Sequence, residues 1–134
     1  MVQSERTELE VVRAPAVDAR IEFMDLLGYI YLQHGLPDKA AVLLTARNVL
    51  QPGNAQTLLT LAVAQVRSEK PNKALETLEQ LAMQGGMDAN FHLVRAQALQ
   101  LLGRMDEAHA AMRTHVSMRS AAPTTQADVG SGDN

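Results

Sequence analysis

Three six-residue stretches decide how this sequence folds: GLPDKA at residues 35–40, EKPNKA at 69–74 and GRMDEA at 103–108. Each stretch ends in an alanine, and the three alanines are spaced 34 residues apart. A fixed period of about 34 residues is typical of helical hairpins that stack into a solenoid. The sequence therefore predicts an all-α protein in which each repeat is one helix-turn-helix unit.

Other positions in each unit keep the same spacing. Small residues recur in the first helix, where two antiparallel helices must approach closely. These residues are Gly28, Ala62 and Ala96. Apolar residues recur in the second helix, where we expect them to fill the gap between one hairpin and the next. These residues are Leu44, Leu78 and Met112.

Turn and cap residues mark the ends of the expected helices. Gly35 and Gly103 suit the positive φ that closes a helix. Pro71 suits the first turn of a helix, where its missing N–H would be unpaired anyway, and Asn54 and Asp88 are good N-caps. We expect a flexible arm at 1–15, a three-repeat domain at 16–119 and a disordered tail at 120–134. The repeats are expected at about 21–54, 55–88 and 89–119.

Composition excludes several classes of function. The net charge is −3 with no basic block, which argues against nucleic-acid binding because a concentrated Lys/Arg face is needed to release counterions. The N-terminus lacks the basic start and apolar run of a signal peptide, and no stretch is apolar enough to insert into a membrane. The chain contains no cysteine. We therefore expect a cytoplasmic protein.

The sequence shows no pattern typical of catalysis or metal binding. Asp106 and His109 stand three residues apart on one expected helix, but no second pair of ligands accompanies them. There is no glycine-rich phosphate loop and no nucleophile motif. We expect no enzyme activity, no metal and no cofactor. A metal-dependent or hydrolytic activity stays as a third alternative.

These features together resemble the tetratricopeptide repeat. The first unit carries most of the family pattern, in Leu27, Gly28, Tyr31, Gly35, Ala40, Leu44 and Pro52. The second unit has Gln65 in place of tyrosine and Glu69 in place of glycine, and the third departs at Arg95 and Leu99. The resemblance implies three hairpins stacked as a short right-handed solenoid.

A narrower resemblance rests on the run from Leu27 to Gly35, followed by residues 40–44 and 50–52. These residues resemble the small three-repeat chaperones of bacterial type III secretion, above all the Y-type chaperone of the export apparatus. The resemblance implies a cytoplasmic protein that holds a small secreted or export-apparatus partner until export. The alternative is a generic scaffold or adaptor in another bacterial envelope or pilus assembly.

The first helix of each repeat lines the concave face of such a solenoid. The expected groove residues are Asp25, Tyr29, Leu32, Leu59, Val63, Val66, Leu93, Gln97 and Gln100. Most are apolar, which suits an amphipathic helix or an extended segment of a partner. The alternative is that the N-terminal arm of the chain occupies this groove through Leu9, Val11 and Val12.

The groove residues and the last helix each bear on the choice of partner. Repeat proteins that grip the acidic ends of heat-shock chaperones resemble one another in a Lys/Asn/Arg clamp at these positions. A carboxylate needs charge-assisted donors, and none is expected in this groove.

On the last helix, an apolar edge for a partner or for a second copy in a homodimer is expected at Ala110, Ala111, Val116 and Met118. The alternative is a last helix polar enough to need no partner.

Overall fold

The computed structural model describes residues 19–121. A first helix covers residues 19–33. It is followed by α2 (Pro37–Leu50), α3 (Ala55–Arg67), α4 (Pro71–Met83), α5 (Ala89–Leu101) and α6 (Met105–Ala121). Within this range the structure contains helices and no strand. The expected arm at 1–15 and all but the first two residues of the expected tail lie outside the described residues.

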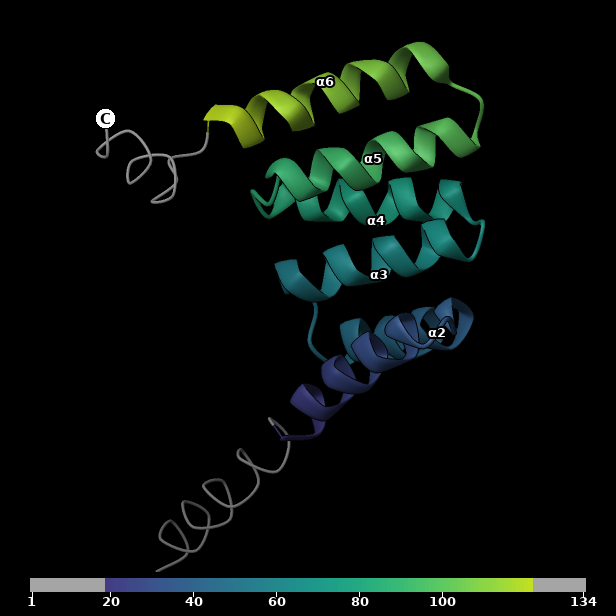
Figure 1. The fold of residues 1–134 in the computed structure, drawn as a ribbon. Helices are drawn as coiled ribbons and strands as arrows, with labels where there is room; N and C mark the ends of the chain where they lie inside the picture. The colour runs from purple at the N-terminus through teal and green to yellow at the C-terminus, as the bar shows by residue number, and fades with distance from the viewer. Residues whose placement is uncertain (1–18, 122–134) are drawn as a thin grey trace, which may run out of the picture.

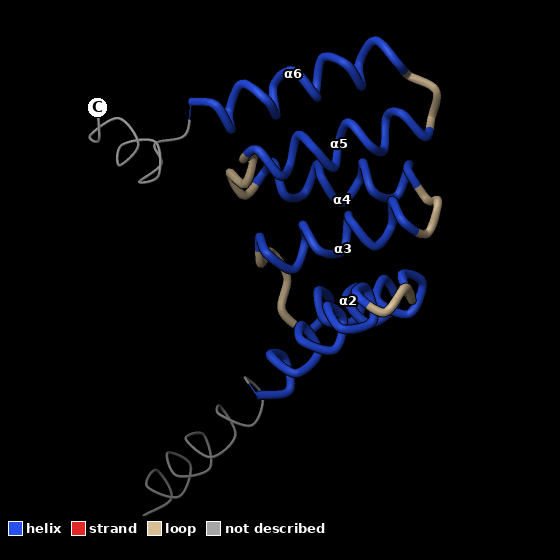
Figure 2. Tube along the Cα trace, in the orientation of Figure 1, coloured by secondary structure: helices blue, strands red, loops and turns tan. Residues whose placement is uncertain are grey.

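The helices form three antiparallel hairpins in one stack (Figure 1), which confirms the predicted fold class. The first helix pairs with α2, α3 with α4 and α5 with α6. Successive hairpins contact each other where α2 packs on α3 and where α4 packs on α5. Helix α3 also contacts α5 directly. Figure 2 shows the turns within hairpins at one edge of the stack and the connections between hairpins at the other.

All three hairpin turns have the same backbone geometry. The residue that ends the first helix of each hairpin has a positive φ: 74° at Gly35, 60° at Glu69 and 74° at Gly103. In the first turn the Leu36 N–H donates to the Tyr31 carbonyl over 2.8 Å, and the bonds one and two repeats later measure 2.9 and 3.0 Å. This is the Schellman arrangement, which satisfies carbonyls at a helix end. The second repeat thus makes the turn with a glutamate.

The predicted helix starts are confirmed. The Asn54 side chain accepts the Thr57 N–H and the Asp88 side chain accepts the Phe91 N–H, each over 2.9 Å. Pro37 and Pro71 stand in the first turns of α2 and α4. These caps and prolines therefore start α2, α3, α4 and α5 where the sequence predicts.

The core lies at the helix crossings. The repeated alanines Ala40, Ala74 and Ala108 are buried, and Gly28 lies so close to Leu44 that an added Cβ would be 2.7 Å from its Cδ2. Leu44 and Leu78 are each 1% exposed, as expected of residues between hairpins, but Met112 is 37% exposed. The prediction for Met112 was wrong because no fourth hairpin covers α6 within the described residues.

Candidate functional site

The expected groove residues form one stripe on each of three helices. On every helix they are spaced four and then three residues apart, and such residues lie above one another on one face. The first helix carries Asp25, Tyr29 and Leu32, α3 carries Leu59, Val63 and Val66, and α5 carries Leu93, Gln97 and Gln100. Because α3 contacts α5 directly, the helices that carry the second and third stripes are neighbours. We call the three stripes together the groove face.

Exposure differs across the groove face. Tyr29, Gln97 and Gln100 are exposed, whereas the four aliphatic residues Leu59, Val63, Val66 and Leu93 are half-buried. The three α3 residues also pack against the core cluster that contains Leu58 and Phe91. Leu32 was expected to be exposed and is buried with Ala40 and Ala64, so it supports the groove face from beneath.

Asp25 is anchored to the fold. The Arg47 Nε lies 2.9 Å from both carboxylate oxygens of Asp25, and the Thr57 hydroxyl donates to Asp25 Oδ1 over 2.8 Å. The Arg47 Nη1 donates to the Gln51 carbonyl over 2.7 Å. The Arg47 side chain is 4% exposed and that of Asp25 is 35% exposed. The carboxylate therefore joins the first helix, α2 and α3, and its charge is matched inside the protein.

A hollow lies beside this ion pair. It has a volume of about 270 Å³ and separates the first helix from α3. Asp25, Leu26 and Tyr29 form one wall, and Gln56 and Thr60 form the other. The buried Leu44 also lines the hollow, so this recess beside Tyr29 offers both apolar and polar contacts.

The sequence analysis missed a larger cavity of about 480 Å³ between α4 and α5. Its lining includes His92, Arg95 and Leu99, which lie on the side of α5 opposite Gln97 because each residue turns a helix by about 100°. Arg95 stands where the first two repeats have leucine, and an arginine keeps its guanidinium near water instead of filling such a site. This departure from the repeat was the sequence signal for the cavity.

The surroundings of this cavity change the pKa of His92. Its pKa is lowered from the ordinary value of 6.5, chiefly by burial and further by the positive charge of Arg95. Asp88 opposes the shift, and His115 adds to it. The neutral imidazole is therefore favoured in the folded protein.

The last helix does not present the expected apolar residues as one edge. Val116 and Ala110 are exposed and Met118 is half-buried, but Val116 and Met118 are two residues apart and lie on different sides of the helix. Ala111 is buried against α5, so its assignment to the edge was wrong: it faces the core of its own hairpin. A hollow of about 550 Å³ lies along this helix and includes Met112 and Val116 in its lining.

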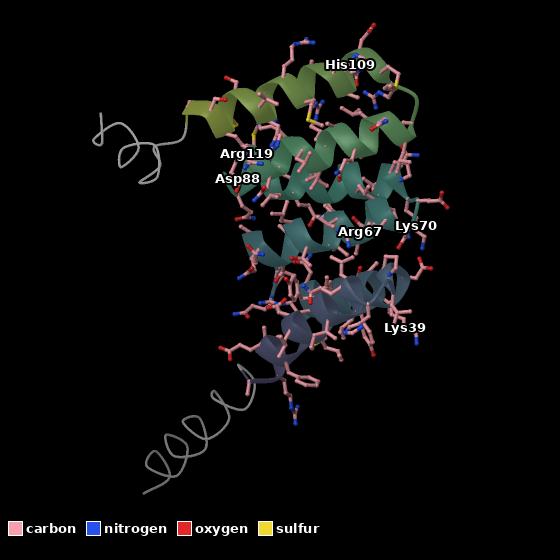
Figure 3. All side chains as sticks on the ribbon, viewed as in Figure 1. Lys39, Arg67, Lys70, Asp88, His109 and Arg119 are labelled. Atoms are coloured by element: carbon pink, nitrogen blue, oxygen red, sulfur yellow. The ribbon has the colours of Figure 1, made fainter. Side chains whose placement is uncertain are left out.

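Some charged side chains lie at the two edges of the stack. Figure 3 shows Lys39 and Lys70 at the edge where the hairpin turns lie, with Asp88 and Arg119 toward the opposite edge. Between residues 19 and 121, no three His, Cys, Asp or Glu side chains are grouped as a metal site would require. In the same range, no helix is both long and apolar enough to cross a membrane.

The sequence matches the tetratricopeptide repeat family over residues 31–98, just over half of the chain, and the chain belongs to that family. Tetratricopeptide repeats are typically non-catalytic modules that bind other proteins. A search of curated protein sequences finds no match.

Two solved structures share the fold. One is the type III secretion translocator chaperone SycD of Yersinia enterocolitica, in an alternative dimer, with a TM-score of 0.69 and 19% identity over 77% of this chain and 78% of SycD. The other is the second tetratricopeptide domain of Spaghetti (RPAP3) bound to the HSP90 peptide SRMEEVD. It has a TM-score of 0.68 and 19% identity over 79% of this chain and 98% of that domain. At this identity the likeness shows the fold alone.

Proposed function

We propose that this protein is a cytoplasmic chaperone of a bacterial type III secretion system that holds a small secreted or export-apparatus protein on its groove face. The observation that carries the proposal is that the aliphatic groove residues Leu59, Val63 and Leu93 are half-buried, while Tyr29 on the first helix and Gln97 on α5 are exposed. The resemblance of residues 27–35 to type III secretion chaperones supports it, as does the fold shared with SycD.

These aliphatic residues suit an apolar helix or extended segment of a partner. Apolar area removed from water contributes about 25 cal/mol per Å², and aliphatic side chains give this gain without requiring a particular side chain of the partner. Tyr29 is well placed to act as an anchor because an aromatic ring buries a large area at a low cost in conformational entropy. The glutamines beside α5 can pair with polar groups at the margin of the segment.

The groove face does not suit an acidic peptide such as the one bound to the RPAP3 domain. A carboxylate needs charge-assisted donors, and none of the groove residues is a cation. Asp25, the charged member, is a carboxylate itself and is already paired with Arg47. The proposed partner therefore docks through apolar contacts.

Co-purification from cells that carry the gene tests the proposal. A groove variant, Tyr29→Glu with Gln97→Glu, changes two exposed residues and should reduce recovery of the partner by about tenfold or more, because charge is placed against apolar surface. Leu59 and Val63 are unsuitable for this test since they also pack against the core.

A matched control is Val42→Glu with Val49→Glu on α2, where both valines are exposed. It adds the same number of carboxylates and should leave recovery unchanged. A small secreted protein recovered in equal ratio, and lost in the groove variant alone, supports the chaperone. Recovery of pilus or envelope components instead, or equal recovery with both variants, contradicts it.

A further inference from the structure

The first helix exposes an apolar stripe that the groove face does not include. Phe23 is 60% exposed, Leu26 56% and Ile30 38%. Their spacing of three and then four residues places them on one face of the helix. A stripe of three large apolar side chains on a single helix indicates a contact surface.

The repeat shows what this stripe would normally contact. The corresponding residues, one and two periods later, are Thr57, Thr60 and Ala64 on α3 and Phe91, Val94 and Ala98 on α5. All of them except the half-buried Thr60 are buried. Phe91 and Val94 share a core cluster with Leu78 and Leu81 of α4. In α5 this face is therefore covered by α4, and in α3 it lies against the preceding hairpin, through Asp25 and Leu32 of the first helix and Ala40 of α2.

The segment that precedes the first helix has the properties of such a cover. The connections between hairpins comprise residues 51–54 and 84–88, and the chain from Pro15 to residue 18 is a similar length. At least fourteen residues precede Pro15, as many as the 14 residues of α2. Among them, Leu9 and Val12 stand three residues apart, so a helix would place them on one face.

We propose that the segment before Pro15 docks as an antiparallel helix on Phe23, Leu26 and Ile30 of its own chain and caps this end of the stack. The α4–α5 joint supplies the geometry, because there Leu81 and Phe91, nearest the connection, share a cluster with Leu78 and Val94, which are farther from it. A connection longer by one residue than at that joint pairs Val12 with Phe23 and Leu9 with Leu26, in place of the charged Arg13 and Glu10. Tethering supports the contact, since a short linker gives an effective concentration in the millimolar range.

This docking has two consequences. The cap removes a large apolar stripe from water, as terminal repeats of solenoids must do to stay soluble. It also covers Leu26 at the recess beside Asp25, and it leaves the α3 and α5 residues of the groove face free for a partner. The inference does not depend on the proposed chaperone function.

Disulfide trapping in the full chain tests the cap, and the natural absence of cysteine makes the background clean. The pair Leu9→Cys with Leu26→Cys should form an intramolecular disulfide under mild oxidation, because the two Cα atoms would lie within about 7 Å. Val12→Cys with Phe23→Cys tests the same register independently. The control is Leu9→Cys with Val116→Cys, whose second position is 54% exposed on α6 at the other end of the stack.

We expect intramolecular closure of at least one test pair to be about tenfold faster or more than that of the control, as measured on non-reducing gels and by mass spectrometry. Equal rates for the test pairs and the control would show that the segment does not dock there. Rapid formation of a disulfide-linked dimer by the single variant Leu26→Cys would show that a second copy covers the stripe. Either result overturns the proposal.

Discussion

The joint between the first and second hairpins and the joint between the second and third place different chemistry at the same three repeat positions. At the first joint these positions hold Asp25, Arg47 and Thr57, which are linked by hydrogen bonds of 2.8 to 2.9 Å. At the second joint they hold Leu59, Leu81 and Phe91. Leu81 and Phe91 belong to one buried cluster, and Leu59 packs against it.

The comparison separates specificity from stability. A buried ion pair is weak evidence for stability, since removing two charges from water costs about as much as their attraction returns. Its hydrogen bonds are directional, however. The Arg47 Nε–H is shared between the two Asp25 oxygens and the Thr57 hydroxyl donates to one of them, so three helices are held at one orientation. An apolar cluster has little directional preference and contributes mainly through burial. The backbone of the repeat accepts both, so the two joints should respond differently to mutation.

The largest effect is expected at the apolar joint. Leu81→Ala removes a side chain that is buried in the cluster and should lower the free energy of unfolding by about 2–5 kcal/mol. The loss should be the same at low and high salt, because no charge is involved. Urea titration followed by circular dichroism measures both quantities. A loss below about 1 kcal/mol would mean that the joint contributes little.

At the polar joint, Asp25→Ala leaves Arg47 buried without its carboxylate and should cost about 2–3 kcal/mol. Copying the apolar joint into this place, with Asp25→Leu, Arg47→Leu and Thr57→Phe together, should recover that loss and add up to about 1–4 kcal/mol. The same titration measures both variants. A triple variant less stable than Asp25→Ala would show that the two joints are not interchangeable.

A control for this comparison is the ion pair between Arg104 and Glu107, in which both side chains are 49% exposed. Glu107→Ala should cost no more than about 0.5 kcal/mol, because an exposed pair three residues apart on a helix is screened by water. The difference from Asp25→Ala measures what burial adds to an ion pair.

The turn between the two joints should be open to improvement. Glu69 has a φ of 60°, a conformation that costs a residue with a Cβ about 1 kcal/mol or more. Glu69→Gly should therefore raise the free energy of unfolding by roughly 1 kcal/mol. The control is Gly103→Ala, which introduces a Cβ at the same turn position and should be destabilising. If both variants are neutral, the turn is under no strain.

The smallest effect is expected from His92 beside the apolar joint. Its pKa is lowered in the folded state from 6.5, so the unfolded chain binds the proton first as the pH falls. The contribution of His92 to stability should be complete above pH 6.5 and should be lost as the pH falls through the lower folded pKa. Melting temperatures measured from about pH 8 to about pH 5 should fall less steeply in His92→Gln. Parallel curves for the two proteins would contradict this.

How exposed each residue of the groove face is depends on the neighbouring hairpins. Its residues could be listed from the sequence because helical spacing alone places them on one side of each helix. Their exposure could not, since Leu32 is covered by residues of α2 and α3. The pairing of Asp25 with Arg47 joins residues 22 positions apart, and its bond to Thr57 spans 32. No local pattern predicts such contacts.

The sequence alone determined the period, the helix starts at Asn54 and Asp88 and the turns at Gly35 and Gly103. These features depend on backbone preferences and on hydrogen bonds between residues close in the chain, so they can be read one repeat at a time. The tertiary structure decided which equivalent positions are buried. Leu44, Leu78 and Met112 hold the same place in their repeats, yet only Met112 is exposed, because burial depends on which hairpin comes next.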